Sequence, residues 1–159
     1  MIQRIQTVHY LIAIVLLAIP LLGFDLFSFS NSEATQHVTF FGNELTEDGS
    51  EFSGYQLPNL PFYWLNLAGI LLLFITMLSF KKLKAQFRIG RFTVIFLFIS
   101  LIILCIALYA YAQYLSVIQP NVMPGAGFYL FAASIIFVLF GNSGVKKDRK
   151  LLDSLNRLR

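Results

Sequence analysis

The stretch Lys81-Lys82-Leu83-Lys84-Ala85-Gln86-Phe87-Arg88-Ile89-Gly90-Arg91 decides the fold of this chain. Five of its eleven residues are cationic, and a long apolar run flanks it on each side. A cluster of this charge crosses a bilayer only at high cost, so it stays on the side of the membrane where it is made. The two flanking runs are therefore predicted to be antiparallel membrane spans that leave the cytoplasm and return to it.

The composition favours lipid surroundings. Of the 159 residues, 57% are hydrophobic and 13% are charged, and the mean hydropathy is +0.72. Soluble domains carry about 25% charged residues, so the excess of apolar side chains fits a membrane protein better. The single cysteine, Cys105, excludes a disulfide framework within the chain.

Four apolar runs predict four spans, at about residues 8–29, 60–80, 92–113 and 123–140. The polar segment 30–59 is then an outer loop, residues 81–91 form a cytoplasmic hinge, and residues 145–159 form an amphipathic cytoplasmic tail. We therefore predict one domain, residues 1–159, with an all-α fold: a four-transmembrane-helix bundle.

The outer loop also carries a β signal. Residues 36–41 have β character, residues 47–50 read as a turn, and residues 51–55 are a candidate return strand. This pattern predicts a small β-hairpin. Two strands alone are marginally stable in water, so the hairpin is expected to pack against helix ends or a partner.

The charges fix the orientation. All twelve Lys and Arg lie in three places, namely Arg4, the hinge and the tail, whereas six of the eight acids lie between Asp25 and Glu51. The positive-inside rule then places both termini in the cytoplasm and loop 30–59 in the periplasm. The chain has no Asn-X-Ser/Thr acceptor, which fits a bacterial inner membrane slightly better than a secretory pathway.

The tail is the first candidate site. Leu151, Leu155 and Leu158 repeat at intervals of four and three residues on a basic helix. Such a helix can rest on anionic lipid headgroups, or it can dock into a groove of a partner protein. The predicted contact residues are Lys146, Lys147, Arg149, Lys150, Leu151, Leu155, Leu158 and Arg159.

The second candidate site lies within the spans. Asn66, Tyr109 and Gln113 are polar residues near the outer ends of two spans, and they form either a polar pocket or ordinary interhelical hydrogen bonds. Asp25 and His37 lack the spacing of a metal site, and a solvated acidic face is the favoured interpretation.

Two terminal segments carry a family resemblance. The opening Met1-Ile2-Gln3-Arg4-Ile5-Gln6-Thr7-Val8 and the closing segment from Lys147 to Arg159 bracket the four predicted spans. The chain resembles a family of uncharacterised four-span inner-membrane proteins, a domain of unknown function typical of Bacteroidetes. The resemblance implies an inner-membrane location and no assigned activity, and it carries over no catalytic residue.

These observations predict a non-enzymatic accessory or assembly subunit of a membrane protein complex. Neither paired carboxylates nor a nucleophile beside a base is visible, so we expect no enzyme, no cofactor and no metal. The expected partners are anionic lipid at the cytoplasmic face and other membrane subunits or further copies of the chain, and not nucleic acid. The alternative is a small-molecule or lipid-binding membrane protein with a pocket inside the bundle.

Overall fold

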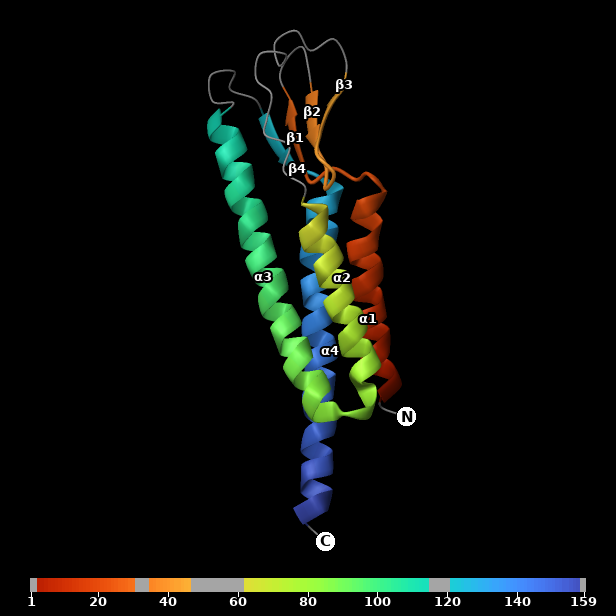
Figure 1. The fold of residues 1–159 in the computed structure, drawn as a ribbon. Coiled ribbons are helices and arrows are strands. Elements are labelled where there is room, and N and C mark those ends of the chain that lie inside the picture. The colour runs from red at the N-terminus through yellow and green to blue at the C-terminus, as the bar shows by residue number, and fades with distance from the viewer. Residues whose placement is uncertain (1–2, 31–34, 47–61, 115–120, 158–159) are drawn as a thin grey trace.

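The computed structural model describes residues 3–30, 35–46, 62–114 and 121–157. Four helices lie along one another, and the N- and C-terminal ends lie opposite a small sheet (Figure 1). Short 3₁₀ turns at Ile19–Leu22 and Ser79–Lys81 continue the first two helices. The helices are α1 (Gln3–Ala18), α2 (Tyr63–Leu78), α3 (Leu83–Tyr114) and α4 (Ala126–Arg157).

The helices form a closed ring. Helix α1 packs against α2 and α4, and α3 packs against the same two helices from the other side. The most extensive packing is between α1 and α4, which are the first and last helices of the chain. The ring is therefore closed by contacts between the two ends of the sequence.

The buried positions of every helix recur at alternating intervals of three and four residues. This repeat is typical of helices that pack nearly parallel, as in helix bundles and coiled coils. The positions in this repeat are Gln6, Tyr10, Ala13 and Leu17 in α1; Asn66, Gly69, Leu73 and Thr76 in α2; Gln86, Gly90, Thr93, Leu97, Ser100, Leu104, Ala107 and Tyr111 in α3; and Gly127, Phe131, Ser134, Val138, Gly141, Val145 and Asp148 in α4, where Ile135 is buried in addition.

The polarity of the bundle is inverted relative to a water-soluble protein. Many of its buried positions hold glycine, serine, threonine or amide side chains, whereas large apolar side chains such as Trp64, Leu71 and Ile106 are about 60% exposed. An apolar surface of this extent is costly in water and suits lipid. Three helical segments, Ile5–Leu22, Leu83–Tyr114 and Ala126–Leu151, are long and apolar enough to cross a membrane. Helix α2 is equally apolar but has only 16 residues.

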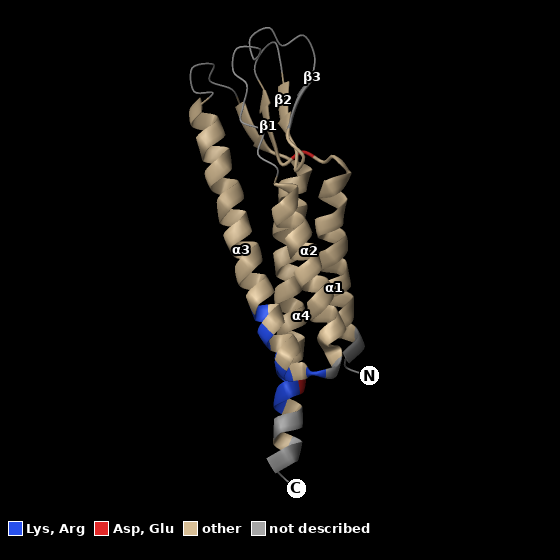
Figure 2. Ribbon diagram, viewed as in Figure 1, with Lys and Arg blue, Asp and Glu red and all other residues tan. Residues whose placement is uncertain are grey.

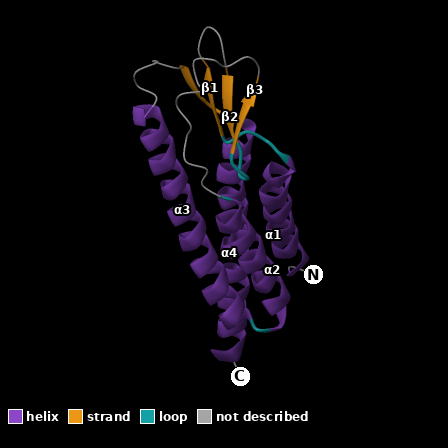
Figure 3. Cartoon of the chain, turned by 45° about the horizontal axis from the view of Figure 1, so that its top comes forward, coloured by secondary structure: helices purple, strands orange, loops and turns teal. Residues whose placement is uncertain are grey.

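Four short strands form an antiparallel sheet in the order β3-β2-β1-β4 (Figure 3). They are β1 (Phe27–Ser30), β2 (Thr35–Val38), β3 (Asn43–Thr46) and β4 (Asn121–Pro124). The predicted β-structure in the outer loop is thus present, with β3 as the return strand. The connection between the paired strands β2 and β3 is at residues 39–42, whereas the predicted turn, 47–50, and the predicted return strand, 51–55, lie outside the described residues. Strand β4 was not predicted; it comes from the α3–α4 connection, so the sheet joins two loops that are distant in sequence.

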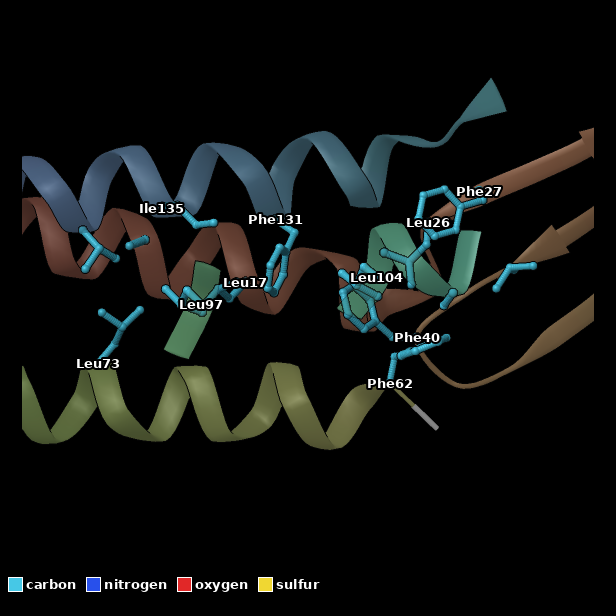
Figure 4. Packing of buried hydrophobic residues seen from close by; sticks show 14 of the residues in the cluster. Leu17, Leu26, Phe27, Phe40, Phe62, Leu73, Leu97, Leu104, Phe131 and Ile135 are labelled. Carbon is cyan, nitrogen blue, oxygen red and sulfur yellow. The ribbon is translucent and has the colours of Figure 1, made fainter. Parts of the chain in front are cut away.

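The sheet rests on the helix ends. The Phe40 carbonyl accepts a hydrogen bond of 3.0 Å from the Tyr63 backbone N–H at the start of α2. The Phe40 ring lies 6.1 Å from the ring of Phe131 on α4, measured between centroids. Buried side chains from all four helices and the sheet form one continuous layer (Figure 4). The expected packing of the β-structure against helix ends is therefore observed.

The predicted element boundaries differ from the structure at three places. The first helical segment ends at Leu22 rather than near residue 29, because Gly23 adopts a left-handed conformation (φ 99°) and β1 follows. Most of the predicted hinge 81–91 is the start of α3, and the chain reverses within residues 79–82. The predicted fourth span and tail are one helix, because Lys, Arg and Leu are good helix formers and no glycine or proline interrupts residues 145–157.

Candidate functional site

Lysine and arginine residues gather at the end of the bundle opposite the sheet, which we call the basic end (Figure 2). Two segments supply them: the start of α3 and the last third of α4. At the other end, Asp25 lies between the 3₁₀ turn Ile19–Leu22 and β1, close to the sheet. The described cations at the basic end are Lys82, Lys84, Arg88, Arg91, Lys146, Lys147, Arg149 and Lys150.

Helix α4 continues past the ends of the other helices, so the predicted tail projects from the basic end (Figure 1). Lys146, Lys147 and Lys150 are exposed, and Leu151 is 54% exposed. The Arg149 guanidinium lies 6.0 Å from the centroid of the Phe87 ring on α3, which is a cation–π geometry. Among the other predicted tail residues, Leu155 lies within α4, and Leu158 and Arg159 lie outside the described residues.

A buried acid anchors the base of this extension. Asp148 is 8% exposed although cations flank it, and its Oδ2 accepts a hydrogen bond from Nε2 of Gln6 on α1. Gln6 itself is 3% exposed, and Val145, one turn earlier on the same face, is fully buried. The sequence analysis did not single out this pair. The available signal was the three-and-four spacing of Gly141, Val145 and Asp148, which continues the buried face of α4 into the tail.

A second polar link joins three helices one turn deeper. The Tyr10 hydroxyl on α1 donates to Oδ1 of Asn142 on α4, at 2.7 Å. The Asn142 Nδ2 group donates to the backbone carbonyl of Gly90 on α3, at 2.8 Å. Gly90 permits this approach, because a Cβ atom there would overlap with the Asn142 side chain. Hydrogen bonds of this type fix how membrane helices meet.

The predicted intrabundle polar residues occupy two separate places. Asn66 is fully buried on α2 and donates a hydrogen bond of 2.9 Å from Nδ2 to the Leu17 carbonyl on α1. Tyr109 and Gln113 are exposed on α3, where the Gln113 amide donates to the Tyr109 hydroxyl at 3.2 Å. The structure brings Tyr109 and Gln113 together but does not bring Asn66 to them. Of the two predicted alternatives, a polar pocket or ordinary interhelical hydrogen bonds, Asn66 fits the second.

At the sheet end, His37 and Asp25 form a pair with 2.7 Å between Nδ1 and Oδ2. Both side chains are about one-third exposed, at 29% and 35%. The Asp25 carbonyl also accepts a hydrogen bond of 2.8 Å from the Gly127 backbone N–H in the first turn of α4. The pair therefore links β2 to the start of α4. Across the described residues, no group of three His, Cys, Asp or Glu side chains gathers as a metal site would require.

The chain matches a known protein family. A family model described as "Domain of unknown function (DUF4293)" matches residues 2–158. No curated protein matches the chain. The expectation of a domain of unknown function extending over essentially the whole chain is therefore confirmed.

Proposed function

The chain belongs to the DUF4293 family, a domain of unknown function, and we propose that it is a non-enzymatic accessory or assembly subunit of a larger complex in the bacterial inner membrane. In this proposal all four helices span the bilayer, both termini are cytoplasmic and the sheet is periplasmic. The observation that carries the proposal is the extension of α4 beyond the bundle, which presents a basic helix with an exposed leucine.

The charge distribution supports this orientation. The cations of α3 and α4 share one end of the bundle, and membrane proteins keep Lys and Arg in cytoplasmic segments (Figure 2). Helix α2 is the short span, with a length of about 24 Å at 1.5 Å per residue. A short span is accommodated by local thinning of the bilayer at modest cost. The turn Ser79–Lys81 adds to its length on the basic side.

The length of α4 supports a contact outside the membrane. Its 32 residues extend over about 48 Å, whereas the hydrocarbon core of a bilayer is about 30 Å thick. The hydrogen bond between Gln6 and Asp148 holds the base of the extension against α1. A helix that is already ordered loses less conformational entropy when a partner binds it, and helix-in-groove recognition needs this kind of apolar and charged face.

Co-purification from native membranes in mild detergent tests the proposal. The triple variant Lys147→Gln, Lys150→Gln, Leu151→Ser removes two charges and one leucine from the extension. The control Lys82→Gln, Lys84→Gln, Leu78→Ser makes the same chemical changes at the basic end but on other segments. We expect the full chain and the control to retain the same stoichiometric membrane proteins, and the triple variant to lose them.

Either of two results would contradict the proposal. One is a full chain that migrates as a monomer and crosslinks to no other membrane protein in intact membranes. The other is an equal loss of partners in the triple variant and in the control, because the extension would then have no special role. Two differently tagged copies of the chain, co-expressed, show whether the partner is a second copy.

A further inference from the structure

A groove of about 770 Å³ lies between α3 and α4 at the basic end, open toward the surroundings of the bundle. Its volume falls in the range of about 300–1,000 Å³ that is usual for small-molecule sites. Arg91 and Val94 line it from α3, and Leu139, Asn142 and Lys146 line it from α4. This groove differs from both sites predicted from the sequence, the tail contacts and the intrabundle polar residues. It shares only Lys146 with the predicted tail contacts.

The groove changes from charged to apolar along its length. On α3, Arg91 lies one turn before Ile95, and on α4, Lys146 lies two turns after Leu139. Two turns of helix correspond to about 11 Å at 5.4 Å per turn. Asn142 and Ser143 lie between the charged and the apolar ends. A phospholipid shows the same order over a similar distance, from phosphate through the ester oxygens to the acyl chains.

A second, smaller hollow adjoins the charged end of the groove and shares Phe87 and Arg91 with it. Its volume is about 270 Å³, and Lys84, Arg88 and Arg149 complete its lining. No acid lines either hollow among the residues described. The nearby Asp148 bonds to Gln6 on α1 and so belongs to the α1–α4 contact. The two cations of the groove itself, Arg91 and Lys146, therefore face no acid among its described lining residues.

We propose that this groove binds one anionic phospholipid, with its phosphate between Arg91 and Lys146 and its acyl chains along Val94, Ile95 and Leu139. Asn142 donates one amide hydrogen to the Gly90 carbonyl, and an amide nitrogen carries a second hydrogen that a lipid ester oxygen can accept. Basic pockets between membrane helices at the cytoplasmic side are suited to anionic headgroups. The inference rests on the membrane placement in the proposed function and not on any protein partner.

Native mass spectrometry of the purified full chain in mild detergent tests the site. The probe is an equimolar mixture of phosphatidylglycerol and phosphatidylethanolamine with identical acyl chains, titrated against the protein. We expect a single bound lipid with preference for phosphatidylglycerol, because its headgroup carries a net negative charge. The double variant Arg91→Gln, Lys146→Gln should weaken phosphatidylglycerol binding about 25-fold, since each cation near an anionic lipid contributes about fivefold.

A matched control separates a defined site from general attraction to charge. The variant Lys82→Gln removes one positive charge from the basic end, as Arg91→Gln alone does, but Lys82 lines neither the groove nor the smaller hollow. Its phosphatidylglycerol affinity should remain that of the unmodified chain, whereas Arg91→Gln alone should lower that affinity about fivefold. An equal loss of affinity in these two single variants, or equal binding of the two lipids by the unmodified chain, would overturn the proposal.

Two further measurements show whether the phosphate in the groove belongs to a lipid or to a soluble molecule. Glycerol 1-phosphate has the anionic group without acyl chains, so it should fail to displace the bound phosphatidylglycerol at millimolar concentration. The variant Leu139→Ser alters an exposed apolar wall residue and should weaken phosphatidylglycerol binding. Efficient displacement by glycerol 1-phosphate, together with an unaffected Leu139→Ser variant, would reassign the groove to a soluble phosphate. Because this assay uses the purified protein alone, its failure leaves the co-purification result intact, and the reverse also holds.

Discussion

Close packing between helices allows only glycine at position 90. The Gly90 carbonyl accepts the hydrogen bond from Asn142, and the missing side chain of this residue leaves the space that the Asn142 amide occupies. A Cβ atom at this position would also lie 3.3 Å from Cγ2 of Thr76 on α2. Three helices therefore meet at a position where only hydrogen fits, and the Tyr10 hydroxyl depends on the same Asn142 side chain.

The substitution Gly90→Ala should destabilise the protein by about 1–3 kcal/mol, because it overpacks a site that two hydrogen bonds hold in place. Unfolding in mixed detergent micelles measures this free energy. In an Asn142→Ala background the overlapping side chain is gone, so the same glycine substitution should cost clearly less. If Gly90→Ala lowers the free energy of unfolding equally in the unmodified chain and in the Asn142→Ala background, the close contact with Asn142 is not the source of the effect.

At the scale of elements, α4 has two parts with different neighbours. As far as Asp148 it belongs to the bundle, since Val145 is fully buried and Asp148 bonds to Gln6. The sequence analysis placed the boundary between span and tail near residue 145, where the charges begin. In the structure, the buried face of α4 continues to Asp148, because this acid interrupts the run of cations and its side chain bonds to Gln6 on α1.

Truncation separates the two parts of α4. A chain that ends after Lys150 keeps Val145 and Asp148, so its stability should equal that of the full chain. A chain that ends after Gly144 loses both and leaves the buried Gln6 amide without its acceptor, which should cost about 3–5 kcal/mol. Thermal unfolding of the two truncated forms in detergent, beside the full chain, gives the comparison. Equal stabilities for the two truncations would show that Asp148 does not anchor the helix.

At the scale of the whole molecule, the distribution of polarity decides where the protein can exist. Many large apolar side chains are exposed along all four helices, and the lysine and arginine residues of α3 and α4 lie at one end of the bundle (Figure 2). Cys105 is exposed on α3 within the most apolar segment, so in a membrane lipid would cover it. The proposed topology then places the β4 strand and the extension of α4 on opposite sides of the membrane.

Labelling of single cysteines in intact cells tests this topology. In a Cys105→Ser background, Asn121→Cys lies on β4 and Lys147→Cys lies at the basic end, and both positions are exposed. A membrane-impermeant maleimide should label the first in intact cells and the second only after permeabilisation. The unmodified Cys105 should resist the reagent in membranes under both conditions. The opposite labelling order would invert the orientation, and labelling of both positions in intact cells would rule out the four-span arrangement.

The sequence predicted the helices well and their buried faces poorly. The apolar runs near Leu11, Leu72 and Ile102 are clear in the sequence, but large apolar side chains are both exposed and buried, so hydrophobicity alone does not mark the interior. The interior also holds small and polar residues at a seven-residue repeat, and Asn66 is the one of these that the sequence connected to another helix. Gln6 was missed because an amide near a chain end is equally typical of a membrane interface.

Strand β4 was missed for another reason. Asn121–Pro124 is short and ends in proline, which removes a hydrogen-bond donor and is typical of loops and edge strands. Its pairing with β1 joins residues more than ninety positions apart, as the register Phe27↔Pro124 shows. Local patterns contain no information about a pairing of this separation, whereas the β2–β3 hairpin is local. Of residues 36–41, which carried the β signal, 36–38 lie in β2 and 39–41 lie in the connection to β3.

This long-range pairing has a consequence for biosynthesis. Strand β1 follows α1 and is made early, but its partner β4 is translated only after α3, and the α1–α4 packing that closes the ring needs α4, the last helix of the chain. For most of translation, one edge of β1 and one face of α1 therefore have no partner from their own chain. During that interval the nascent protein depends on the insertion machinery or on lipid to cover them. Premature termination in the first turns of α4, before most of its contacts with α1 are made, should thus yield an open, protease-sensitive intermediate rather than a smaller stable bundle.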